Sequence, residues 1–161
     1  MAVQVSSIGK GKDFVVKSEI SADKVDAYFA DIDGCHALCP LHFEAHLCNR
    51  GKFISLEADL DVRLALCCYR CGVGFERDFQ AHLSLKLIEA SSVGSVDEII
   101  LSEDDLNTVT YQDPVIELED LLLESVYLEF DDQCLCSEDC KGLCMQCGKN
   151  LNEGPCSCSA S

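Results

Sequence analysis

Residues 54–87 read ISLEADLDVRLALCCYRCGVGFERDFQAHLSLKL, and this stretch decides the fold. From Ile54 to Leu66 every second residue is apolar, and most of the residues between are charged or polar. The alternation resumes from Phe75 to Leu87, where only Arg77 interrupts it. A period of two residues is that of a strand with one buried and one solvated face. We therefore expect two long antiparallel strands that meet in a tight turn at residues 67–74.

Shorter elements precede this hairpin. Residues 13–20 read as a strand, and Ser21 is suited to cap a helix over residues 22–30. Val25, Tyr28 and Phe29 share one side of that helix, as expected for core packing.

The histidines of the next segment belong to a strand in this interpretation. His42-Phe-Glu-Ala-His46 differs from the HExxH motif of zinc proteases because its Glu stands one place too late. The alternation instead puts His42, Glu44, His46 and Cys48 on one face of a half-exposed strand. A metal-dependent hydrolase that uses His42, His46 and a carboxylate stays an alternative.

The segment after the hairpin is strongly acidic. Sixteen Asp and Glu residues, and no Lys or Arg, occur between Leu87 and Cys140. Residues 89–112 read as loop, and residues 117–127 have leucines at helical spacing with acidic residues at the N-terminal end.

These elements predict an α+β fold. An antiparallel β-sheet built on residues 42–88 would be covered by helices near 22–30 and 117–127. We expect a domain over residues 1–132 and a C-terminal zinc-stapled loop over residues 133–161.

Cysteine dominates the C-terminal stretch. Residues 134–158 read CLCSEDCKGLCMQCGKNLNEGPCSC and hold seven of the thirteen cysteines. Cys144-Met-Gln-Cys147-Gly148 has the form of a zinc knuckle, in which a glycine permits the tight turn that aims backbone amides at two sulfurs. Cys156 and Cys158 are the first choice to complete a tetrahedral site, and Cys136 and Cys140 form a further candidate pair. The sequence thus predicts one structural zinc ion among six candidate ligands.

Alternative roles for these cysteines stay open. A disulfide framework suits secreted domains, and nothing at the N-terminus indicates secretion. The spacings differ from those of ferredoxin-type iron–sulfur motifs, and reduced spectator cysteines are a further possibility. A catalytic zinc usually has histidine among its ligands, and no histidine follows His82.

Two cysteine motifs also carry a resemblance. The run Cys140-Lys-Gly-Leu-Cys-Met-Gln-Cys-Gly-Lys-Asn-Leu-Asn152, followed by Cys156-x-Cys158, closely resembles the C-terminal motif of the YceD family of large ribosomal RNA subunit accumulation proteins. Cys68-Tyr-Arg-Cys71 matches the C-x-R-C element that the family places between two strands, although Gly72 stands where many relatives have Leu. The resemblance spans about residues 42–158. It implies a non-enzymatic factor that supports ribosomal RNA accumulation or ribosome assembly.

The role of Cys68 and Cys71 is open on sequence alone. The pair could form half of a zinc site, a redox pair or a simple turn, and the turn is favoured because no second pair lies nearby in sequence. An alternative function is zinc or redox sensing through exposed thiols of Cys67, Cys68 and Cys71.

The net charge of −17 bears on possible partners. A field of this sign repels phosphate backbones and attracts basic proteins. We therefore expect ribosome assembly partners, with a basic ribosomal protein favoured over direct binding to large-subunit RNA. No segment has the length and hydropathy of a membrane span, which predicts a soluble, cytoplasmic protein without a membrane partner.

Overall fold

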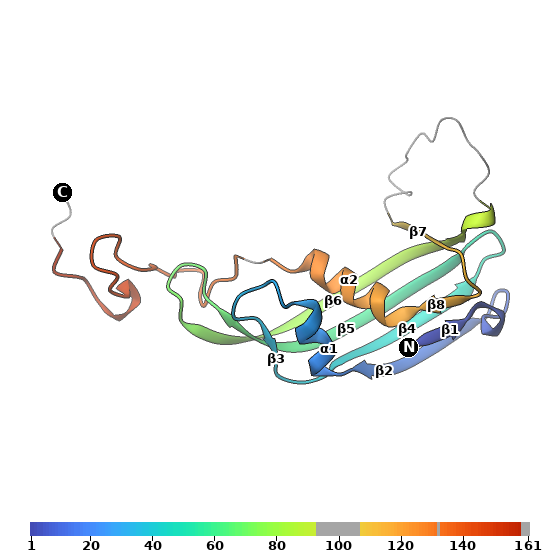
Figure 1. Cartoon of the computed structure of the whole chain (residues 1–161), viewed down its shortest axis with the longest axis horizontal. Helices are drawn as coiled ribbons and strands as arrows, with labels where there is room; N and C mark the ends of the chain where they lie inside the picture. The colour runs from blue at the N-terminus through green and yellow to red at the C-terminus, as the bar shows by residue number, and fades with distance from the viewer. Residues whose placement is uncertain (93–106, 132, 159–161) are drawn as a thin grey trace, which may run out of the picture.

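The computed structural model describes residues 1–92, 107–131 and 133–158. They form a mixed α+β molecule, elongated along a central hairpin (Figure 1). Its strands are β1 Ala2–Gln4, β2 Asp13–Ile20, β3 His36–Ala37, β4 Leu41–Asn49, β5 Ile54–Cys67, β6 Gly74–Glu89, β7 Thr108–Tyr111 and β8 Val115–Glu117. Its helices are α1 Ala22–Tyr28 and α2 Leu118–Glu129, with 3₁₀ turns at η1 Val5–Ser7, η2 Ala90–Ser92 and η4 Leu151–Glu153.

The hairpin β5–β6 is the centre of the main sheet. Its register runs from Ile54 opposite Leu87 to Cys67 opposite Gly74, which confirms the two predicted strands and their turn. Along β5 burial alternates residue by residue, with Leu56, Leu60 and Leu64 inside. The sheet continues outward in the order β2-β4-β5-β6-β7, with β3 paired to β5, and β1 and β8 form a separate two-stranded sheet.

Both helices pack on the apolar side of the sheet, where the main hydrophobic core lies. Helix α2 buries Leu118, Leu122, Leu123 and Val126, each of which stabilises the fold by roughly 1–3 kcal/mol. Phe29, at the end of α1, stacks edge-on against Tyr127 and Phe130. The predicted α+β fold with covering helices is therefore correct.

Several details differ from the sequence prediction. Thr108–Tyr111 lies within the predicted loop yet pairs as a parallel edge strand with β6; residues 93–106 of that loop lie outside the described residues. Ser21 stands at the N-cap of α1, but its side chain makes no capping hydrogen bond. Cys48 is buried, although the alternation placed it on the polar face. None of the helices described is long and apolar enough to cross a membrane.

Candidate metal centre

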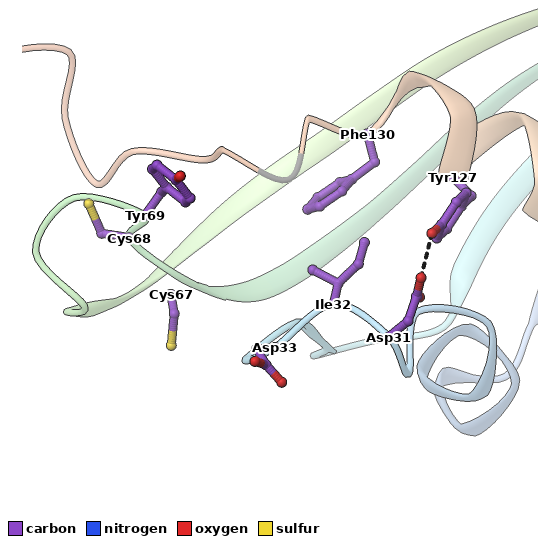
Figure 2. Close-up of a pocket in the computed structure, with 8 residues that line it drawn as sticks. All are labelled: Asp31, Ile32, Asp33, Cys67, Cys68, Tyr69, Tyr127 and Phe130. Carbon is purple, nitrogen blue, oxygen red and sulfur yellow. Dashed lines mark hydrogen bonds between the residues drawn. The ribbon is translucent and has the colours of Figure 1, made fainter.

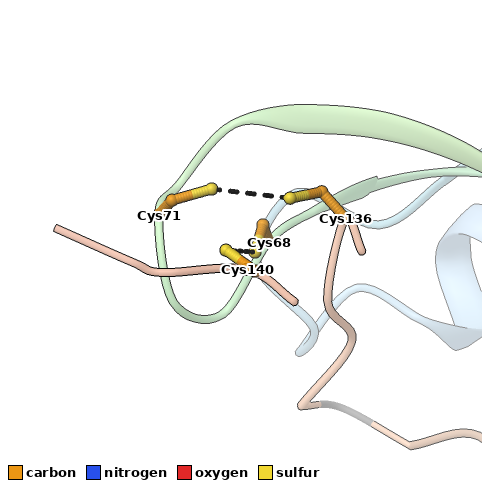
Figure 3. Close-up of side chains that lie close together, drawn as sticks. All are labelled: Cys68, Cys71, Cys136 and Cys140. Carbon is orange, nitrogen blue, oxygen red and sulfur yellow. Dashed lines mark hydrogen bonds between the residues drawn. The ribbon is translucent and has the colours of Figure 1, made fainter. Parts of the chain in front are cut away.

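Eight of the cysteines gather into two groups of four. We call residues 67–74 the tip, residues 133–158 the tail, and the two groups the tip group and the tail group. The tip group contains Cys68 and Cys71 from the tip and Cys136 and Cys140 from the tail (Figure 3). Its four sulfurs lie within 4.8 Å of one another, with 3.6 Å between Cys68 and Cys140 and 3.7 Å between Cys71 and Cys136.

The tail group is built from the tail alone. Cys144, Cys147, Cys156 and Cys158 also place their sulfurs within 4.8 Å of one another, and those of Cys144 and Cys156 are 3.4 Å apart. Cys147 is exposed and its three partners are half-buried, so this group lies nearer the surface than the tip group.

The sulfur separations fit metal binding better than disulfide bonding. A zinc ion with four thiolates at about 2.3 Å in a tetrahedron holds its sulfurs about 3.8 Å apart. Disulfide sulfurs are bonded at about 2.0 Å, far closer than any pair here. Both groups consist of soft sulfur ligands that surround a common centre, so each can accept one tetrahedral ion.

The local backbone prepares one thiol of each group for ionisation. Burial opposes ionisation of the Cys68 thiol, but three backbone N–H groups, including that of Cys136, lower its pKa to about 6. The backbone N–H groups of Cys147 and Gln146 likewise lower the pKa of Cys144 to about 6. With these pKa values, each group holds a thiol that is ionised near neutral pH. The thiolate is the form of cysteine that binds metal.

For two other thiols, Cys71 and Cys158, the surroundings oppose ionisation. A hydrogen bond with the Cys147 thiol raises the pKa of Cys158 to about 12. For Cys71, a backbone N–H of Val73 favours the thiolate, yet burial and the neighbouring thiols together raise its pKa to about 12. A divalent cation at the centre would remove this opposition to ionisation.

The six C-terminal candidates are thus divided between two places. Cys144, Cys147, Cys156 and Cys158 lie together, in the combination that the sequence favoured for one site. Cys136 and Cys140 lie instead beside Cys68 and Cys71. Which of these residues bind metal stays a prediction.

On sequence alone a turn is favoured for Cys68–Cys71, because no second pair lies nearby in sequence. The tip does turn there, because the N–H of Gly72 donates to the carbonyl of Cys68 at 2.8 Å. However, the tail brings Cys136 and Cys140 to it, so the missing second pair is distant in sequence and close in space. The structure therefore offers two candidate metal groups where the sequence predicted one.

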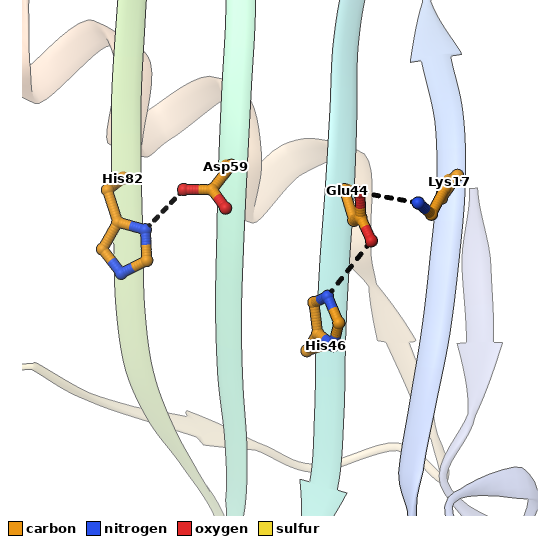
Figure 4. A network of polar contacts seen from close by, with 5 residues as sticks. All are labelled: Lys17, Glu44, His46, Asp59 and His82. Atoms are coloured by element: carbon orange, nitrogen blue, oxygen red, sulfur yellow. Dashed lines mark hydrogen bonds and ion pairs between the residues drawn. The ribbon is translucent and has the colours of Figure 1, made fainter.

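The histidines of β4 lie away from both groups, on the solvated face of the sheet. His46 Nε2 lies 3.3 Å from Glu44, whose carboxylate is 2.8 Å from Lys17 Nζ, and His82 Nδ1 lies 2.7 Å from Asp59 (Figure 4). Exposed pairs of this kind contribute little stability. Within the described residues, the groups with metal-ligand geometry consist of cysteine alone, and His42 and His46 belong to neither.

A cavity beside the tip was not predicted from the sequence. It has a volume of about 540 Å³ and lies between the end of α2, the tip and the loop after α1 (Figure 2). Its lining combines two carboxylates, three aromatic rings, two cysteines and an isoleucine, from Asp31, Ile32, Asp33, Cys67, Cys68, Tyr69, Tyr127 and Phe130. Three distant segments contribute to it, so no local pattern reveals it.

The comparisons with known proteins include a family match that covers both cysteine motifs. The family model described as "Large ribosomal RNA subunit accumulation protein YceD" matches residues 56–161, which include both groups. "Large ribosomal RNA subunit accumulation protein YCED homolog 1, chloroplastic" of Arabidopsis thaliana is 26% identical over 141 residues, covering 74% of this chain and 44% of the relative. The chain thus spans less than half of that relative's length. No solved structure matches this chain. On the match over residues 56–161, the chain belongs to the YceD family of large ribosomal RNA subunit accumulation proteins.

Proposed function

We propose that this protein is a non-enzymatic factor that supports accumulation of large-subunit (23S) ribosomal RNA and acts through a basic assembly partner. The observation that carries the proposal is the family match over residues 56–161, because it includes nearly all of the hairpin β5–β6 and the whole tail. The predicted cytoplasmic location stays a prediction, and the Arabidopsis relative is named as chloroplastic.

The charge distribution favours an indirect action on RNA. The chain carries twelve Lys and Arg against twenty-nine Asp and Glu. Tight, charge-driven binding to RNA requires clustered basic residues that neutralise several phosphates. In the tail, Lys141 and Lys149 are exposed, but Glu138, Asp139 and Glu153 accompany them. A basic ribosomal protein, by contrast, would be attracted from a distance by the acidic surface.

The cavity beside the tip supports a specific contact with such a partner. Asp31 and Asp33 are exposed, and the ring of Tyr127 lies beside Asp31, with Phe130 also lining the cavity (Figure 2). The Tyr127 hydroxyl donates to Asp31 at 2.6 Å, which holds this carboxylate in place. Carboxylates beside aromatic rings suit a lysine or arginine side chain, which gains both an ion pair and a cation–π contact.

The proposal is tested by binding measurements at near-physiological salt. The full chain is titrated with large-subunit RNA alone and with isolated basic ribosomal proteins. We expect binding to one or more of the proteins and little binding to naked RNA. Tight binding to RNA without any ribosomal protein would contradict the indirect action.

A variant locates the contact on the surface. Asp33→Asn removes one carboxylate at the cavity, and we expect it to weaken partner binding about three- to tenfold, as for loss of a partly desolvated ion pair. Asp61→Asn makes the same change on the solvated face of β5 and serves as the control. Equal loss in both variants would mean that overall charge acts, and not the cavity.

We also propose that the tail group holds a structural zinc ion. The tail buries few apolar side chains, and Leu143 is 43% exposed, so a metal would supply most of the stability of this segment. Native mass spectrometry of Cys144→Ser should show loss of that ion. Retention of the full metal content in this variant would contradict the assignment.

Zinc or redox sensing stays the alternative function, and one observation favours it. Cys67 is exposed and lies next to Cys68 of the tip group. Alkylation rates of the metal-loaded protein separate the two functions: sensing requires rapid reaction of tip thiols at neutral pH, whereas a structural role predicts protection of Cys68 and Cys71.

A further inference from the structure

We propose that the tip group is a second structural zinc site, which ties the end of the β5–β6 hairpin to the tail. This inference concerns Cys68, Cys71, Cys136 and Cys140, and it does not depend on the function proposed above. It rests on a backbone repeat, on the way the tail is docked, and on the surroundings of the four sulfurs.

The tip and the tail contain the same backbone turn. At the tip, the N–H of Cys68 donates to the carbonyl of Val73 at 3.0 Å, and the N–H of Gly72 donates to that of Cys68 at 2.8 Å. In the tail, the N–H of Cys144 donates to Lys149 at 2.8 Å, and the N–H of Gly148 donates to Cys144 at 2.8 Å.

The glycines of the two turns also agree. Gly72 and Gly148 each follow the second cysteine, and each has a positive φ, of 68° and 72°. The left-handed conformation is costly for residues other than glycine. Cys68–Gly72 is therefore a second copy of the knuckle that the sequence revealed only at Cys144–Gly148, and it presents two thiols in the same way.

The tail is held on the tip by contacts that do not involve the four sulfurs. The N–H of Tyr69 donates to the carbonyl of Cys134 at 2.9 Å, and the guanidinium of Arg70 donates to the carbonyl of Cys140 at 3.1 Å. Arg77 of β6 donates to the carbonyl of Leu135 at 2.8 Å. The second pair of thiols is thus brought to the knuckle by an independent set of hydrogen bonds.

The surroundings suit a closed, structural site. Cys68, Cys71 and Cys140 are buried, with 3%, 6% and 3% of their surfaces exposed, and no fifth ligand group joins them among the described residues. The side-chain amide of Asn152 lies 3.4 Å from the Cys140 sulfur, to which it can donate, as outer groups do to metal-bound thiolates. Four thiolates without an open position are typical of structural zinc.

The first test is the zinc content of the full chain. We expect two zinc ions per chain by native mass spectrometry and elemental analysis, one for each group of four thiols. Cys71→Ser should retain one ion. Cys67→Ser is the matched control: Cys67 lies beside Cys68, yet its thiol points away from that of Cys68 (Figure 2), and this variant should retain both ions. Iron in place of zinc, or a zinc content that Cys71→Ser leaves unchanged, would overturn the inference.

A second measurement needs no variant and so does not depend on a variant's folding. Alkylation of the wild-type protein, followed by mass spectrometry, should show Cys68, Cys71, Cys136 and Cys140 protected until a chelator is added. Cys67 should react at the same rate before and after chelation. Reaction of the four thiols in the zinc-loaded protein would overturn the site even if the tail group holds its ion and the ribosomal partner binds.

Discussion

Gly142 lies where the tail crosses the tip of the hairpin. Its φ is +72°, and a Cβ added there would lie 3.1 Å from the carbonyl oxygen of Arg70. The N–H of Leu151 also donates to the carbonyl of Gly142 at 2.9 Å. Without a Cβ, Gly142 can lie close to Arg70 of the tip while its carbonyl accepts the hydrogen bond from Leu151. A larger residue here would push the tail away from the tip.

We expect Gly142→Ala to destabilise the docked tail more than the strained backbone alone would. A left-handed alanine costs about 1–2 kcal/mol, and the contact with Arg70 adds to this cost. Gly11→Ala is the control, because Gly11 has a φ of +65° and nothing within 4 Å of the added Cβ. Thermal unfolding of both variants gives the comparison; equal losses would mean that the approach to Arg70 is unimportant.

Asn152 connects the two cysteine groups. Its Nδ2 can donate to the Cys140 sulfur at 3.4 Å, and its Oδ1 accepts from the N–H of Lys141 at 2.8 Å. Asn150, which caps η4, accepts from the N–H of Asn152 at 3.0 Å. The loop that closes the tail group thus also reaches a thiol of the tip group.

Asn152→Asp should weaken zinc binding by the tip group about tenfold, as changes to groups that support metal ligands do. The carboxylate removes the donor and places a negative charge beside the sulfur. Gln146→Glu makes the same change of charge on an exposed side chain of the tail and is the control. Chelator competition at fixed pH measures the affinities, and identical curves for the two variants would contradict the role of Asn152.

Helix α2 is fixed at its first turn by charges from two other segments. Glu119 pairs with Lys24 of α1 and, at 2.9 Å, with the N-terminal ammonium. The hydrogen bond from Lys24, with that from the N-terminus, lowers the pKa of Glu119 below its ordinary value. Acidic residues are also favourable at this end of a helix.

The pH dependence of this contact follows from the direction of the shift. A lowered pKa stabilises the folded state above the ordinary value of 4.5, and that stability is lost as the pH falls through the folded pKa. Glu119→Gln should therefore cost about 0.5–1 kcal/mol at pH 7, because the partners are partly exposed, and the cost should disappear in acid. Glu124→Gln, on an exposed position of α2, controls for charge. Denaturant unfolding between pH 7 and 3 gives the comparison, and a constant difference would contradict the linkage.

The elements that the sequence predicted well are those whose periodicity depends on one buried face. In β5 and β6 the alternation continues for long enough to identify both strands and the turn that joins them. Strand β7 has four residues within an acidic, interrupted segment, and its parallel pairing with β6 depends on the path of the chain between them. Strands β1 and β8, with three residues each, give no usable period.

The tip group was missed for a related reason. Its two pairs are separated by 65 residues from Cys71 to Cys136, so that only the folded chain brings them together. One local signal was available, since Cys68-x-x-Cys71-Gly72 repeats the spacing and the glycine of Cys144-x-x-Cys147-Gly148. The shared turn follows from that repeat, whereas the identity of the second pair requires the docking of the tail.

At the scale of the whole molecule, the metal groups and the main core are separate. The core around β4, β5 and α2 consists mainly of aliphatic and aromatic side chains, together with the thiols of Cys35 and Cys134, and the buried thiols of the tip group form a cluster of their own. A chelator should therefore release the tail and leave the sheet folded. Hydrogen exchange with and without chelator measures this: protection should fall in the tail and persist in β4 and β5. Loss of protection throughout the chain would mean that the tail is part of the cooperative core.

The central hairpin makes the molecule longer than a compact chain of this size would be. Fourteen residues of β5 span about 48 Å at about 3.4 Å per residue. A compact chain of 161 residues would have a radius of gyration of only about 15 Å. Small-angle scattering should give a clearly larger radius. Because the tip and the β1–β8 sheet lie toward opposite ends of this hairpin (Figure 1), partners bound at the two ends would be held apart by a rigid spacer of nearly that length.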